Sequence, residues 1–147
     1  MFFVKAIGLL MLFSVCALVG LLKSYELKCR KERLLKLSKQ MKALSEYVRI
    51  GNSERKTLIE KAFGDDFSIA EDNIKGEYLK KEDKKLFSEF FSEFGKSEKK
   101  AEYDKVLLYA NFLNSKLQKA EADCERLSRL YGETGVLAGL AIVIFLI

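Results

Sequence analysis

Charge is distributed unevenly along this chain of 147 residues, and that distribution constrains its fold more than any other feature. Residues 6–22 and 136–147 contain no charged side chain, whereas every acidic residue and every basic residue except Lys5 lies between them. A mean hydropathy near zero is therefore an average over two different environments. The pattern predicts an integral membrane protein with a hydrophobic segment at each end and a charged domain between them.

The first hydrophobic segment is long enough to cross a bilayer. As a helix, its uncharged stretch spans about 25 Å, or about 31 Å if residues 2–4 are included and Lys5 extends its ammonium group to the interface. A cleaved signal peptide is the alternative, but no A-x-A site follows and the segment runs directly into basic sequence. Lipoprotein processing at Cys16 is disfavoured because Val15 precedes it. We interpret residues 1–22 as an uncleaved transmembrane anchor.

The second hydrophobic segment is shorter. Its uncharged residues cover about 18 Å, and counting back to Leu130 extends it to about 27 Å. We predict a C-terminal transmembrane helix over residues 131–147. Gly135 and Gly139 form a G-x-x-x-G pattern, and Gly132 precedes them by one turn. Small residues let transmembrane helices approach closely, so these glycines pack against the first span or a partner subunit, or have no special role.

Basic residues beside the first span predict the topology. Lys5 is the single charge before the span, whereas a dense basic group follows it: Lys23, Lys28, Arg30, Lys31 and Arg33. The positive-inside rule therefore places residues 23–130 in the cytoplasm and both termini across the membrane. Because the excess positive charge is concentrated next to the membrane, it favours contact with anionic lipid headgroups over nucleic-acid binding.

Apolar residues of the middle domain recur at helical spacing, which predicts an all-α, antiparallel helical bundle. A first helix should end near Ile50, with this apolar face: Leu34, Leu37, Met41, Leu44 and Val48. A second helix, capped by Ser53, should end near Gly64. Two short helices are expected over residues 66–79 and 82–94. The second has five large apolar residues on one face: Leu86, Phe87, Phe90, Phe91 and Phe94.

The strongest periodic pattern covers residues 103–131 and predicts one long amphipathic helix that leads into the second span. Its apolar residues alternate steps of three and four: Tyr103, Val106, Ala110, Leu113, Leu117, Ala120, Cys124, Leu127 and Tyr131. This stripe could pair with another copy as a coiled coil. We favour packing within the chain against residues 34–48, because the small residues of the stripe suit close helix packing. Likewise, we interpret the phenylalanine-rich stretch as core in preference to a binding surface.

Several kinds of catalytic machinery are excluded. The chain has no histidine, so it has neither a Ser-His or Cys-His pair nor an imidazole metal site, and it has no phosphate-binding glycine motif. Its three cysteines are scattered, as expected for free thiols in a reducing compartment. The acidic pairs at 65–66 and 71–72 could hold a divalent cation, but they more simply complement helix dipoles. We predict no catalytic residue, metal or cofactor.

Several of these features together resemble a known family. The chain has a short anchor, a basic first helix, an LIEKAF element after a helix break, and the ending LYGETGVLAGLAIVIFLI. The ending is the most specific part, and its matching positions are Tyr131, Gly135, Leu137, Gly139, Leu140, Ile142, Val143, Ile144, Leu146 and Ile147. Over essentially its whole length the chain resembles the stage III sporulation protein AB family of endospore-forming bacteria.

This resemblance implies a membrane component of the channel complex between mother cell and forespore, in the mother-cell membrane around the forespore. It also implies a cytoplasmic bundle similar to the F-type platform domains of type II secretion and type IV pilus systems. Such platforms contact a cytoplasmic ATPase, so the implied partners are an ATPase resembling stage III sporulation protein AA and other channel components.

We expect the partner surface on the phenylalanine-rich helix and the loop after it, which lie farthest from the membrane if the long helix stands upright: Phe87, Phe91, Phe94, Lys96, Lys99 and Lys100. Two alternatives remain. One is a generic membrane-anchored coiled-coil structural or signalling protein that self-associates, and the other is a membrane-bound enzyme.

Overall fold

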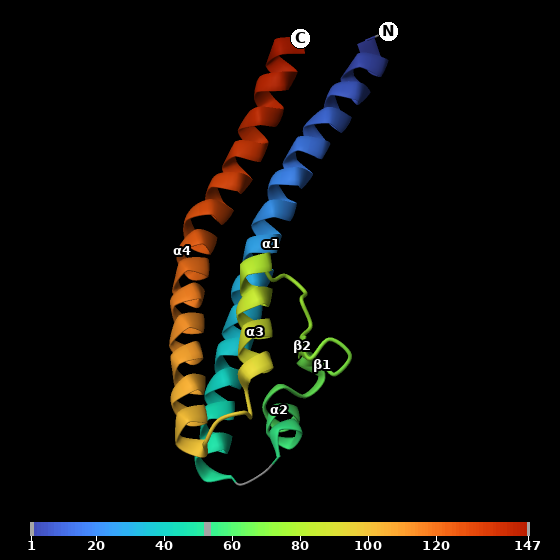
Figure 1. The fold of residues 1–147 in the computed structure, drawn as a ribbon. Coiled ribbons are helices and arrows are strands. Elements are labelled where there is room, and N and C mark those ends of the chain that lie inside the picture. Colours follow the sequence, from blue (N-terminus) through green and yellow to red (C-terminus); the bar gives the residue numbers. More distant parts are fainter. Residues whose placement is uncertain (1, 52–53, 147) are drawn as a thin grey trace. The chain divides into compact units, whose positions relative to one another are not determined.

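The computed structural model describes the backbone of residues 2–51 and 54–146, and the side chains of residues 7–51 and 54–145 (Figure 1). It is 85% helical, which confirms the all-α prediction. The described elements are α1 (Phe2–Ile50), α2 (Arg55–Phe63), the 3-10 turn η1 (Gly64–Asp66), β1 (Phe67–Ser68), β2 (Asn73–Ile74), α3 (Lys81–Glu93) and α4 (Lys99–Leu146).

The chain forms two compact units. One consists of residues 1–31 with residues 120–147, and the other of residues 32–119. These divisions lie inside the predicted domain boundaries at 22 and 130, because helix packing continues beyond the uncharged sequence. Where the lipid begins and ends therefore stays a prediction.

The unit of residues 1–31 and 120–147 exposes a large apolar surface, which is unfavourable in water. Both of its helices are long and apolar enough to cross a membrane, and only 6% of each most hydrophobic window is buried. The core helix of a soluble protein would instead be mostly buried. Many large apolar side chains are exposed here: Ile7, Leu10, Met11, Val15, Leu18, Leu21, Leu22, Leu137, Leu140, Ile144 and Phe145. Such a surface is consistent with a membrane location.

Glycines hold the two helices of this unit in direct backbone contact. A Cβ atom on Gly20 would lie 2.5 Å from the carbonyl oxygen of Tyr131, and one on Gly135 would lie 3.2 Å from that of Cys16. A Cβ atom on Gly139 would lie 2.6 Å from the ring of Phe13. Gly135 and Gly139 thus pack against the first apolar segment. Gly132 does not, because a Cβ atom there would meet nothing within 4 Å.

The unit of residues 32–119 has a core of aliphatic and aromatic side chains. The ring of Phe91 is at its centre, with centroids 4.9 Å from Phe67, 5.1 Å from Phe90 and 5.4 Å from Phe63. Residues 34–48 of α1 and 106–117 of α4 bury their predicted apolar faces in this unit: Leu34, Leu37, Met41, Leu44, Val48, Val106, Ala110, Leu113 and Leu117. Packing within the chain therefore accounts for the apolar stripe of α4 without a second copy.

The segment between α2 and α3 is not the helix predicted for residues 66–79. Instead β1 and β2 pair antiparallel, with Phe67 opposite Ile74 and Ser68 opposite Asn73. Asp72 has a left-handed backbone (φ 45°), which reverses the chain. The hairpin buries Ile74 and leaves Ile69 87% exposed at its turn. The prediction was wrong because the Asp and Asn side chains of this segment favour turns and Gly76 disfavours a helix.

The other short elements agree with the sequence. The segments α2 and α3 begin and end within two residues of their predicted limits, counted from the described residues. The predicted N-cap Ser53 lies outside the described residues, and the structure has Glu54 at the N-cap position of α2. At the start of α3 the backbone N–H of Lys80 donates to the carboxylate of Asp83 at 3.3 Å, which is one half of a capping box.

Candidate functional site

The six residues predicted to contact a partner separate into two groups. Phe87 and Phe91 are fully buried, and Phe94 is 3% exposed. Their i, i+4 and i+7 spacing places them on the apolar face of α3 or at its end, and this face packs into the core. The prediction that these three rings face a partner is therefore wrong, whereas their interpretation as core is confirmed.

The three lysines of the set lie on the surface. Lys96 is in the loop after α3, and Lys99 and Lys100 form the first positions of α4. All three side chains are exposed. This group, which we call the lysine rim, is the part of the predicted partner surface that the structure leaves accessible.

Arg55 and Gly95 shape the loop that bears Lys96. The guanidinium of Arg55 donates to the carbonyl oxygen of Phe91 at 2.6 Å and to Asp72 at 3.0 Å, which ties α2 to the end of α3 and to the hairpin. Gly95 has φ 87°, and a Cβ atom there would lie 2.9 Å from the Cδ atom of Arg55. A left-handed backbone pressed against a side chain in this way requires glycine.

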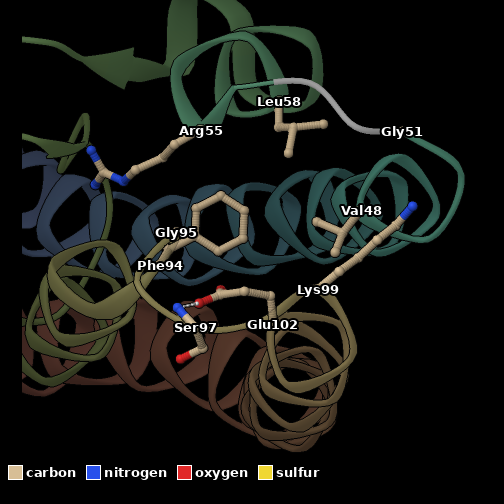
Figure 2. A pocket seen from close by; sticks show the side chains of 9 residues that line it. All are labelled: Val48, Gly51, Arg55, Leu58, Phe94, Gly95, Ser97, Lys99 and Glu102. Atoms are coloured by element: carbon tan, nitrogen blue, oxygen red, sulfur yellow. Dashed lines mark hydrogen bonds between the residues drawn. The ribbon is translucent and has the colours of Figure 1, made fainter.

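Beside this loop is a cavity of about 280 Å³. We call it the end pocket, and Figure 2 labels the nine residues that line it. They come from the last turn of α1, from α2, from the loop after α3 and from the first turn of α4. Val48, Leu58 and Phe94 form apolar walls, and Glu102 contributes a carboxylate.

Glu102 is the buried polar group of the end pocket. Its side chain is only 5% exposed. Its Oε1 atom accepts a hydrogen bond from the backbone N–H of Ser97 at 2.9 Å, drawn in Figure 2, which holds the loop over the start of α4. Its Oε2 atom is buried and has no hydrogen-bond partner among the residues that the structure describes.

Sequence reasoning missed Glu102, although a signal was present. Glu102 lies four residues before Val106 and eight before Ala110, so it occupies the apolar face of α4. A carboxylate at a buried register position is unusual unless it has a structural or binding role.

A half-buried carboxylate, Asp66, is fully paired. Arg33 donates to its Oδ1 atom at 2.6 Å, while Lys36 at 2.6 Å and Gln40 at 2.7 Å contact Oδ2. Burial raises the pKa of Asp66, but the hydrogen bonds from Arg33, Lys36 and Gln40 outweigh it and hold the pKa well below its ordinary value.

The basic residues predicted to flank the membrane differ in their exposure and in their contacts. Arg33 donates to Asp66 and to the carbonyl oxygen of Lys75 at 3.1 Å, which gives it a structural role. Lys23 and Lys28 are exposed, and Lys23 pairs with Glu26 at 2.9 Å. Arg30 and Lys31 are half-buried. For these four residues lipid contact stays a prediction.

One member of each acidic pair considered as a cation ligand has another partner, since Asp66 binds three side chains of α1 and Asp72 binds Arg55. Within residues 7–51 and 54–145, no group of three or more acidic or cysteine side chains is arranged to hold a metal ion.

Comparison with known families assigns the chain. Residues 60–147, which are more than half of it, match the model of stage III sporulation protein AB. The chain belongs to this family. It is therefore a sporulation-associated protein. No curated protein and no solved structure matched the chain.

The match to the stage III sporulation protein AB family covers only part of the end pocket. Phe94, Gly95, Ser97, Lys99 and Glu102 lie inside the matched region, as does the lysine rim. The other lining residues precede it: Val48, Gly51, Arg55 and Leu58. The family assignment thus includes the loop and the carboxylate but assigns no role to either.

Proposed function

We propose that this member of the stage III sporulation protein AB family is a membrane platform of a secretion-like channel complex between mother cell and forespore. In this proposal residues 32–119 lie in the cytoplasm and dock a secretion-type ATPase resembling stage III sporulation protein AA. Family membership supports the role in sporulation, and the two exposed apolar helices support the membrane anchor.

The observation that carries the docking role is the position of the lysine rim within the unit of residues 32–119. The chain enters this unit at Glu32 and leaves it at Lys119. The last turn of α1 and the first turn of α4 both line the end pocket. The end of one helix therefore lies beside the start of the other, and within this unit the two helices run antiparallel. At 1.5 Å per residue, Ile50 is about 27 Å from Glu32, and Lys99 is about 30 Å from Lys119. The lysine rim is thus at the end opposite both connections, where a large partner can approach.

A generic self-associating coiled coil is less well supported. Such a protein would use the apolar stripe of α4 for pairing with another copy. In this chain Val106, Leu113 and Leu117 are already buried. Pairing through the stripe would require the unit to open.

The test is co-purification of the full-length protein, in detergent, with the co-expressed ATPase. Wild type should retain the ATPase, and the triple variant Lys96→Glu, Lys99→Glu and Lys100→Glu should lose it, because charge reversal at an interface replaces attraction with repulsion. The matched control reverses three other exposed lysines of the same unit: Lys39→Glu, Lys42→Glu and Lys81→Glu. Equal loss in both triple variants, or no ATPase bound by wild type, would remove the proposal's support.

A further inference from the structure

The end pocket combines a cavity with an unpaired acceptor. Nearly all buried polar atoms in folded proteins have a hydrogen-bond partner. The Oε2 atom of Glu102 has none among the described residues, although its twin Oε1 is held by Ser97. Leaving a buried carboxylate oxygen without a donor is unfavourable, particularly in surroundings of low polarity. The structure therefore leaves this oxygen available to a hydrogen-bond donor that the described residues do not supply.

The shape of the cavity limits what can supply that donor. Pockets that enclose small molecules usually measure about 300–1,000 Å³. At 280 Å³ the end pocket is below that range, and it suits a single side chain better than a nucleotide or a cofactor. Val48, Leu58 and Phe94 can cover a flexible methylene stem.

Glu102 favours a cationic donor, and the lining also contains two cations, Arg55 and Lys99. Hydrogen bonds from charged donors to a carboxylate are roughly twice as strong as neutral ones. The ring of Phe94 offers a second attraction, because a cation over an aromatic face is stabilised by the ring. The guanidinium of Arg55 binds Asp72 and Phe91, and Figure 2 shows it directed away from Glu102.

We propose that the end pocket receives one lysine or arginine side chain of a docking protein, with Glu102 as its acceptor. The inference rests on the proposed function for the identity of that protein, the ATPase. Of the lysine rim, Lys99 lines the pocket, and Lys96 and Lys100 are its neighbours in sequence, so the rim then faces acidic residues beside the incoming cation. The expected partner segment is a single basic residue flanked by acidic ones, which neither a lipid nor a nucleic acid provides.

The direct test uses two small probes and the full-length protein in detergent micelles. Acetyl-arginine-methylamide carries the cation, and acetyl-norleucine-methylamide carries a similar stem without charge. The readout is the backbone amide resonances of Ser97 and Glu102. In wild type the arginine probe should shift them in a saturable way, and the norleucine probe should bind about tenfold more weakly, as loss of a charged hydrogen bond predicts. Equal binding of both probes, or no shift with arginine, overturns the proposal.

The variant Glu102→Gln tests the acceptor. A glutamine retains an oxygen for the Ser97 N–H, so the loop keeps its anchor, but its amide nitrogen replaces the unpaired oxygen. Binding of the arginine probe should weaken about tenfold. Unchanged binding overturns the assignment of Glu102. Because the probe comparison in wild type involves no substitution, the proposal stays testable even if this variant is unstable.

Co-purification with the ATPase separates this inference from the proposed function. Glu102→Gln should reduce ATPase recovery about tenfold if both are right. If the arginine probe binds wild type but no ATPase is recovered in any context, the proposed function fails and the cation site stands. If the ATPase binds wild type and Glu102→Gln equally, and the probe does not bind, the inference fails and the platform role stands.

Discussion

At the scale of single residues, the half-buried carboxylate of Asp66 and the buried one of Glu102 have different numbers of hydrogen-bond partners. Three side chains of α1 donate to Asp66. These contacts connect the turn after α2 to α1. Glu102 receives one, from the backbone of Ser97. A carboxylate with all its oxygens paired is a structural group. One with an unpaired oxygen beside a cavity is suited to binding.

Replacing Asp66 should reveal its contribution to stability. The carboxyl of an unfolded chain titrates near pH 3.9, and in the folded protein the pKa of Asp66 is lower. The ionised group therefore stabilises the fold above about pH 4, and this stabilisation is lost as the pH falls through the folded pKa. We expect Asp66→Asn to lower the free energy of unfolding by about 2 kcal/mol at pH 7, measured with denaturant.

The same experiment at lower pH tests whether the negative charge of Asp66 is what stabilises the fold. The difference between wild type and Asp66→Asn should shrink progressively below about pH 4. The exposed neighbour Asp65 is the matched control, and Asp65→Asn should change stability by less than about 0.5 kcal/mol. A difference that stays constant down to pH 2 would contradict the assigned role of the Asp66 charge.

Phe91 is the second residue for which a large effect is expected. It is fully buried and its ring touches four other phenylalanines. Phe91→Ala should cost about 3–5 kcal/mol of unfolding free energy, because it removes apolar burial and leaves a cavity. Phe112 is 52% exposed, so Phe112→Ala serves as control and should cost far less in the same denaturant titration. Equal losses would show that Phe91 is not a core residue.

At the scale of elements, each long helix has two different kinds of surface. In the unit of residues 1–31 and 120–147, small residues let α1 and α4 touch backbone to backbone. In the unit of residues 32–119, the same helices present large side chains such as Leu37 and Leu113 to a common core. Close approach suits a lipid environment, where packing contacts and not exclusion of water hold helices together.

The close contact at Gly20 predicts that a larger side chain there separates α1 from α4. A chain with Cys16, Cys29 and Cys124 replaced by serine, and cysteines placed at Ser24 and Ser128, should form an intramolecular disulfide under mild oxidation. The hydroxyl groups of Ser24 and Ser128 are hydrogen-bonded, so the two positions face each other. Gly20→Val should slow disulfide formation several-fold, because its side chain would collide with the backbone at Tyr131.

Gly132 supplies the matched control for the glycine experiment. A side chain at this position meets no neighbour, so Gly132→Val should leave the rate of disulfide formation unchanged. If both valine variants slow the reaction equally, the close approach at Gly20 is not what holds the pair. The rate is followed by the mobility of reduced and oxidised protein on gels.

At the scale of the whole molecule, the topology predicted from basic residues is the next property to measure. In a cysteine-free chain, Ile69→Cys at the turn of the hairpin is well exposed. A cytoplasmic location predicts that a membrane-impermeant maleimide labels it in broken cells but not in intact ones. When the protein is produced in the plasma membrane of non-sporulating cells, a cysteine added at the C-terminus should show the opposite result and react in intact cells. Labelling of Ile69→Cys in intact cells would reverse the proposed orientation.

Much of this protein could be read from local sequence patterns. The uncharged ends predicted two apolar helices, and steps of three and four predicted the faces that α1, α3 and α4 bury. Both are properties of short stretches, because helical periodicity records which side of an element avoids water. The same patterns identified the phenylalanine-rich stretch as core, although they did not prevent three of its rings from also being predicted as partner contacts.

Tertiary structure decided the features that depend on residues far apart in sequence. The hairpin at residues 67–74 follows Asp66, whose place is set by Arg33 and Gln40 on another helix. The close contact of Gly20 with Tyr131 and the pocket beside Glu102 likewise join distant segments. The sequence alone determined which surfaces must be covered. Packing decided which atoms cover them and which hydrogen-bond acceptor is left for a partner. The reason is that hydrogen bonds and close contacts depend on where separate segments meet.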